Sequence, residues 1–125
     1  MHYVIGAQER DLHNMEELII LDHEENLSEC IASNLFWIKD EKVFTPTLST
    51  GCINGVMRTQ MKKWCQDLKV DFLEVKEKTK TLKNADQVFC MNVAGINIFE
   101  TIGTNEYATK GKVLNLVIER VLDPR

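Results

Sequence analysis

The sequence predicts one mixed α/β domain in which a β-sheet is packed by helices. Two observations predict this fold class. Apolar, β-branched runs alternate along the chain with segments of helical periodicity. Two neighbouring runs are separated only by Asp40-Glu41, as the arms of a hairpin are. The length of 125 residues fits a single domain with a sizeable core, and the chain contains no internal repeat or linker.

The first half of the chain predicts a helix followed by strands. Val4, Ile5 and Leu12 favour a helix from His2 to about His13. Glu17 to Leu21 is too short and apolar for a helix and predicts a buried strand. A polar turn and further strands follow, at Asp22–Asn26, Leu27–Glu29, Asn34–Lys39 and Lys42–Thr45.

The second half predicts two longer helices and further strands. Pro46 cannot donate a ladder hydrogen bond, so a loop is expected from Thr45 to Gly55. The apolar residues that follow share one helix face: Met57, Met61, Trp64, Cys65 and Leu68. The face with Met57, Met61 and Trp64 indicates core packing. The remaining predictions are a strand at Val70–Val75, a short helical connection at Thr79–Asn84, strands at Gln87–Met91 and Ile96–Ile102 separated by Gly95, and a helix at Val113–Leu122.

Composition excludes several classes of function. The net charge of −4 argues against a nucleic-acid or anionic-membrane partner, and the lysines at 76, 78, 80 and 83 are interleaved with acidic residues. No segment is apolar for the length of a membrane helix, and the first residues lack a basic region followed by an apolar stretch, so a cytoplasmic protein is expected. The four cysteines lack metal-binding spacing and are expected to be reduced and structural.

Other residue types that often carry chemistry lack the necessary pattern. His2, His13 and His23 have no cysteine or carboxylate at metal spacing, so no metal site is predicted. The serines lack a Gly-x-Ser-x-Gly context, and a hydrolase is unsupported.

Glu29 and the Gly51–Arg58 segment are the candidate binding residues. Glu29 precedes the apolar run Asn34–Trp37, where an unpaired carboxylate would be costly, so it needs a cationic partner such as a protonated pyridine nitrogen. A solvent-exposed glutamate at a strand end is the alternative. Gly55, Val56 and Met57 stand at the start of the predicted helix, where free backbone N–H groups bind phosphate well. Together these residues suit a cofactor with a basic ring nitrogen and a phosphate.

Two segments closely resemble motifs of the class IV aminotransferase family. They are Ser28–Trp37, with the sequence SECIASNLFW, and Thr45–Arg58, with the sequence TPTLSTGCINGVMR. This family includes branched-chain and D-amino-acid aminotransferases and 4-amino-4-deoxychorismate lyases. The resemblance implies pyridoxal 5′-phosphate (PLP) as cofactor, and the C-terminal large domain of a fold-type IV enzyme, whose sheet curls into a pseudo-barrel. It implies that Glu29 contacts the pyridine nitrogen, Ile53 one ring face, and Val56 and Met57 the phosphate. Arg58 matches the family motif, although a salt bridge on the helix surface accounts for it equally well.

The segment Met91–Ile96 resembles the family element that touches phosphate and the substrate carboxylate. Asn92 and Val93 are thereby implied in cofactor binding, and the backbone N–H groups of Val93 and Ala94 in substrate binding. The sequence departs here from branched-chain enzymes, which typically have a glycine and then a threonine, whereas Val93 has no hydroxyl. Asn92 favours the lyases slightly. A plain hairpin turn is the alternative interpretation.

The family's Schiff-base lysine and small N-terminal domain lie before the region that matches here. The resemblance therefore implies that residues 1–125 are the cofactor-binding domain of a longer enzyme, inactive alone. The complete enzyme would act on an amino acid and a 2-oxo acid, or on aminodeoxychorismate. An open apolar face predicts a homodimer. The alternative is a non-catalytic remnant that serves as a binding or assembly module.

Overall fold

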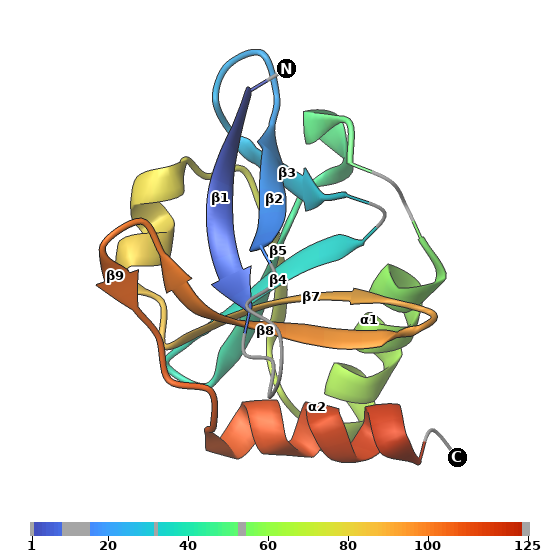
Figure 1. Cartoon of the computed structure of the whole chain (residues 1–125). Helices are drawn as coiled ribbons and strands as arrows, with labels where there is room; N and C mark the ends of the chain where they lie inside the picture. The colour runs from blue at the N-terminus through green and yellow to red at the C-terminus, as the bar shows by residue number, and fades with distance from the viewer. Residues whose placement is uncertain (1, 9–15, 32, 53–54, 124–125) are drawn as a thin grey trace.

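The computed structural model describes residues 2–8, 16–31, 33–52 and 55–123. Figure 1 shows a strongly twisted sheet with α2 running along one side of it and α1 beside α2. The strands are β1 (His2–Gln8), β2 (Glu16–Leu21), β3 (Leu27–Cys30), β4 (Asn34–Lys39), β5 (Lys42–Pro46), β6 (Phe72–Val75), β7 (Gln87–Asn92), β8 (Gly95–Ile102) and β9 (Asn105–Glu106). The helices are α1 (Val56–Leu68) and α2 (Lys112–Leu122), with short 3-10 helices η1 (Leu48–Thr50) and η2 (Thr79–Asn84). The predicted fold class, a mixed sheet packed by helices, is confirmed.

The strands follow the order β3-β2-β1-β8-β7-β4-β5-β6, and β9 pairs with β8. Neighbouring strands are antiparallel except β5 and β6, which are parallel. A parallel pair needs a crossover connection, and α1 forms most of it. No ladder joins β3 to β6 in the described chain, so the structure shows a mixed sheet and no closed barrel.

The predicted N-terminal helix is wrong. Residues His2–Gln8 form β1, which pairs with β2 on one side and with β8 on the other. The apolar spacing of so short a run fits a strand as well as a helix, and the deciding partner, β8, lies more than eighty residues away in the sequence. The expected end of the helix, at residues 11–14, lies outside the described residues. The two-residue strand β9 was not predicted.

The core has two parts, one on each face of the central strands. On β4, Phe36 and Ile38 pack with α1 and α2, whereas Leu35 and Trp37 pack against the opposite face. β7 alternates in the same way, as successive side chains of a strand must. Met61 and Trp64 of α1 lie in the helix-side part, which confirms their predicted packing role. Both faces of β4 and β7 are therefore buried.

Cys30 of β3 and Cys90 of β7 form a disulfide, so the prediction of four reduced cysteines is wrong for this pair. The two residues lie 60 positions apart in the sequence, and only the sheet brings their Cα atoms to 6.6 Å. Cys52 and Cys65 are free and buried. Burial raises the pKa of the Cys65 thiol to about 11. Among the described helices, none has the length and hydropathy of a membrane span.

Candidate functional site

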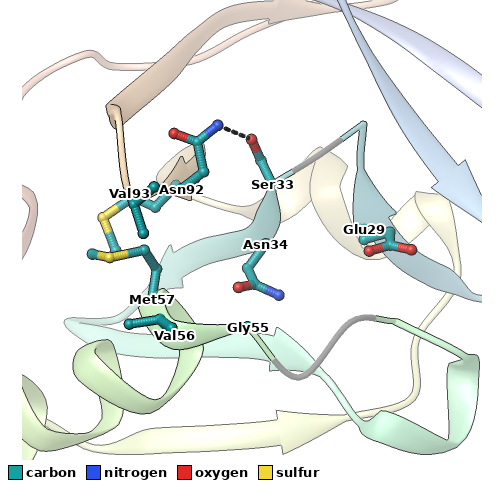
Figure 2. Close-up of a pocket in the computed structure, with 9 residues that line it drawn as sticks. Glu29, Ser33, Asn34, Gly55, Val56, Met57, Asn92 and Val93 are labelled. Atoms are coloured by element: carbon teal, nitrogen blue, oxygen red, sulfur yellow. Dashed lines mark hydrogen bonds between the residues drawn. The ribbon is translucent and has the colours of Figure 1, made fainter.

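A pocket of about 200 Å³ opens between the end of β3, the start of α1 and the β7–β8 turn. Figure 2 shows that its walls come from these separate segments. The lining residues are Glu29, Ser33, Asn34, Gly55, Val56, Met57, Met91, Asn92 and Val93. Six of the seven predicted cofactor-binding residues are in this set, and the seventh, Ile53, lies outside the described residues. The fold therefore brings together residues that the sequence spreads over some sixty positions.

Glu29 is on β3, where its backbone pairs with Ile20 of β2. It lies one residue before the buried Cys30, and its own side chain is only partly exposed. In Figure 2 the carboxylate stands at one end of the pocket, apart from the start of α1. A half-buried carboxylate in such a place can pair with a cationic group of a ligand.

The start of α1 lies on another side of the pocket. Gly55 is the residue before the helix, and no side chain caps the helix start. The first N–H groups of a helix have no partner within the helix, so those of Val56 and Met57 are available to an anion. Gly55 has an extended backbone, and its glycine is required by space: a Cβ atom would lie 2.9 Å from Asn34 Oδ1. Glycine therefore lets α1 begin directly against β4.

The β7–β8 turn supplies Asn92 and Val93. The Ala94 N–H donates to Asn92 Oδ1 at 2.8 Å, and Asn92 Nδ2 donates to Ser33 Oγ at 3.1 Å. Val93 is 82% exposed at the rim of the pocket. Ala94, a predicted substrate-binding residue, does not line the pocket, and its N–H already has an acceptor within the turn.

Arg58, in the first turn of α1, is 3% exposed. One guanidinium nitrogen, Nη1, donates to the Pro46 carbonyl at 2.7 Å and lies 3.4 Å from Thr45 Oγ1. The other, Nη2, pairs with Glu74 Oε1 at 2.8 Å. Arg58 thus forms a salt bridge from a buried guanidinium to the half-exposed carboxylate of Glu74, and its side chain links the end of β5 to β6. The alternative had been a pair on the helix surface. It does not line the pocket.

Three lining residues were not predicted: Ser33, Asn34 and Met91. Asn34 and Met91 occupy paired positions on β4 and β7, and Ser33 precedes β4. The alternation of β4 could have indicated Asn34, because it shares a face of the strand with Phe36 and Ile38, which pack toward the helices. The contact between Ser33 and Asn92 depends on the pairing of distant strands, and nothing in the local sequence predicts it.

Metal chemistry has no support in the part of the chain that the structure describes, because no group of three or more His, Cys, Asp or Glu side chains converges there. The pocket lining contributes one carboxylate, two side-chain amides and one hydroxyl, from Glu29, Asn34, Asn92 and Ser33. It is equipped to bind an organic ligand with polar groups.

Comparisons with known proteins agree with this geometry. Residues 1–96 match the model of the family described as amino-transferase class IV. An aminodeoxychorismate lyase of Vibrio harveyi is 34% identical over 95 residues, which are 74% of this chain and 35% of that protein. A branched-chain-amino-acid aminotransferase of Escherichia coli K12 is 31% identical over 91 residues, 73% of this chain and 29% of that protein.

Solved structures show the same fold. The crystal structure of an aminotransferase from Brucella abortus bound to the cofactor PLP has a TM-score of 0.71 and 21% identity. The match covers 83% of this chain and 36% of that chain. This chain spans about a third of the length of the curated relatives it matches. On the family match and the shared fold, the chain belongs to the class IV aminotransferase family.

Proposed function

We propose that this chain is the cofactor-binding domain of a PLP-dependent enzyme. The complete protein would either transfer an amino group between an amino acid and a 2-oxo acid or release pyruvate from 4-amino-4-deoxychorismate. One observation carries the proposal: Glu29, the start of α1 and the β7–β8 turn, which come from separate segments, line a single pocket. In the complete protein the curled sheet would be the pseudo-barrel of the large domain.

The residues present fit the chemical groups of PLP. Glu29 offers an acceptor for a protonated ring nitrogen, and the Val56 and Met57 N–H groups offer donors for a phosphate. In Figure 2 Glu29 stands apart from Val56 and Met57 at the start of α1. The ring nitrogen and the phosphate of PLP are likewise at different places on the molecule. Gly55 adds no side chain at the helix start, where a Cβ atom would lie 2.9 Å from Asn34 Oδ1.

PLP, when bound, supplies an electron-withdrawing ring that stabilises negative charge on the substrate α-carbon. The Glu29 carboxylate would hold the proton on the ring nitrogen and so maintain that electron withdrawal. The helix start would fix the phosphate, and Asn92 and Val93 would close the pocket on the side of the β7–β8 turn. None of the described lining residues is a lysine, so the lysine that holds the cofactor would come from another part of the complete protein.

The two candidate reactions share their early chemistry and differ in the fate of the activated substrate. Asn92 favours the lyase slightly, because an asparagine at this point of the turn resembles the lyases. The test is to give the complete protein each substrate in turn. Pyruvate released from 4-amino-4-deoxychorismate indicates the lyase, and formation of a new amino acid from a 2-oxo acid indicates the aminotransferase.

The binding role is tested first, with 4′-deoxypyridoxine 5′-phosphate as probe. This compound has the ring nitrogen and phosphate of PLP but no aldehyde, so it cannot react with surface lysines. Titration calorimetry should show binding to this chain, and Glu29→Gln should weaken it by about tenfold through the loss of a charge-assisted hydrogen bond.

Glu100→Gln is the matched control, because Glu100 is exposed on β8 and does not line the pocket. It should leave binding unchanged. If the wild-type chain fails to bind the probe, or if both glutamine variants bind as the wild type does, the proposed role of Glu29 is wrong. Binding without turnover by the complete protein would favour the non-catalytic alternative.

A further inference from the structure

A chain of hydrogen bonds in the wall of the pocket ends on the hydroxyl of Ser33. The Ala94 N–H donates to Asn92 Oδ1 at 2.8 Å, and Asn92 Nδ2 donates to Ser33 Oγ at 3.1 Å. Figure 2 shows the second of these bonds crossing from the β7–β8 turn to the start of β4. Ser33 is 7% exposed and lines the pocket.

The Ala94 N–H determines which atom donates in each of these two bonds. A backbone N–H can only donate, so the Asn92 atom that faces Ala94 must be the amide oxygen. The Asn92 amide nitrogen therefore faces Ser33, and Ser33 Oγ accepts there. A hydroxyl has one proton to donate, and Asn92 leaves that proton unused. In the part of the chain that the structure describes, Ser33 Oγ accepts the bond from Asn92 and makes no hydrogen bond as a donor.

A nearly buried hydroxyl that still has its proton to donate favours an acceptor in the pocket. The available N–H groups at the start of α1 line the same pocket and favour negative charge there. We infer that Ser33, oriented by Asn92, donates its hydroxyl proton to an anionic oxygen of the ligand, either a phosphate or a carboxylate oxygen. Ser33 is then a binding residue, and Asn92 positions it.

This inference rests on the proposed function. Three probes that differ in their anionic groups distinguish a failure of the inference from a failure of the proposed function. They are N-(5′-phosphopyridoxyl)-L-alanine, which has ring, phosphate and carboxylate; 4′-deoxypyridoxine 5′-phosphate, which has ring and phosphate; and 4′-deoxypyridoxine, which has the ring alone. Their dissociation constants are measured by titration calorimetry on the whole chain.

Ser33→Ala should weaken binding of the alanine conjugate by about tenfold, the usual effect of losing a hydrogen bond to a charged group. If the acceptor is the phosphate, 4′-deoxypyridoxine 5′-phosphate weakens equally. If the acceptor is the carboxylate, only the conjugate weakens. Binding of the ring alone should not change in either case.

Asn92→Asp is a second variant, and it tests whether Asn92 leaves the Ser33 proton to the ligand. The aspartate still accepts the Ala94 N–H, but its other oxygen now accepts the Ser33 proton and turns it away from the ligand. Asn92→Asp should therefore weaken the same probes as Ser33→Ala, and Ser33→Ala should add little to it.

Ser28→Ala is the matched control. Ser28 is a buried serine on β3 whose hydroxyl donates to the Thr50 carbonyl at 3.2 Å, away from the pocket lining. It should leave all three dissociation constants unchanged. The inference is overturned if folded Ser33→Ala binds every probe as the wild type does. Failure of the wild-type chain to bind any probe overturns the inference and the proposed function together.

Discussion

The contact between Gly55 and Asn34 joins the start of α1 to β4 and so fixes one wall of the pocket. Gly55 has φ −78° and ψ 167°, a conformation open to any residue. The restriction comes from Asn34, which is 6% exposed and whose Oδ1 would lie 2.9 Å from a Cβ atom at position 55. The glycine is needed for packing, and its conformational freedom is not used.

Gly55→Ala should therefore destabilise the fold through overpacking, by about 1–3 kcal/mol. In an Asn34→Ala background the clash is absent, and the same substitution should cost much less. Urea denaturation of the four proteins of this double-mutant cycle measures the coupling between the two positions. Equal costs in both backgrounds would show that the contact with Asn34 is not the reason for the glycine.

At the scale of elements, the β5–α1–β6 unit positions the pocket. After β5 the chain passes through η1 and α1 and returns as the parallel strand β6. Arg58, in the first turn of α1, donates to the Pro46 carbonyl at the end of β5 and pairs with Glu74 of β6. This one side chain therefore ties together all three elements of the unit.

Arg58→Met should lower the free energy of unfolding by about 3 kcal/mol, because it leaves the buried Pro46 carbonyl without its charged donor. Glu74→Gln should cost less than about 1 kcal/mol, since Glu74 is 41% exposed and the amide oxygen still accepts. Urea denaturation measures both values.

The matched control for Arg58 is Arg120→Met. Arg120 pairs with Asp67 at 3.9 Å on the surface and is 29% exposed, so its loss should change stability by little. A cost for Arg58→Met no larger than that of the control would show that the buried network contributes nothing to the β5–α1–β6 unit.

Local patterns predicted most of the elements. The β4–β5 hairpin, α1, η2 and α2 follow from periodicity and from residues such as Pro46 and Gly95 that interrupt it. β1 was mistaken for a helix, because its partner β8 is distant in the sequence and a short apolar run has no distinctive period.

The residues of the candidate site that belong to local motifs were predicted, and those that depend on the pairing of distant strands were not. Glu29 and Gly55–Met57 belong to motifs that can be recognised locally, and the structure places them at one pocket. Ser33 was not predicted, because its role depends on a hydrogen bond from Asn92, which lies 59 positions later in the sequence on β7. The Cys30–Cys90 disulfide was missed for the same reason, since only the sheet brings the two residues together.

At the scale of the whole molecule, exposed apolar residues stand beside the pocket. Val93 is 82% exposed and Val56 is 71% exposed, and both line it. Ile31, which is 50% exposed, lies in the turn that leads to Ser33. Exposed apolar groups that gather at one place favour association with another surface. We propose that two copies of this chain associate through this region.

Static light scattering should then give a dimer at the highest soluble concentration, and Val93→Lys should shift it toward the monomer. Leu122→Lys is the matched control, because Leu122 is 80% exposed at the end of α2 and does not line the pocket. A wild-type monomer, or equal effects of the two variants, would contradict this association.

The open rim at Val56 and Val93 also bears on how such a domain can evolve. Glu29 and the start of α1 line the pocket. A ligand group that extended past the exposed Val56 and Val93 would have no contact with the described lining residues. Selection for a new substrate side chain could then act on other parts of the protein while this domain stays unchanged. One inherited scaffold could in this way serve both the lyases and the aminotransferases to which the chain is similar.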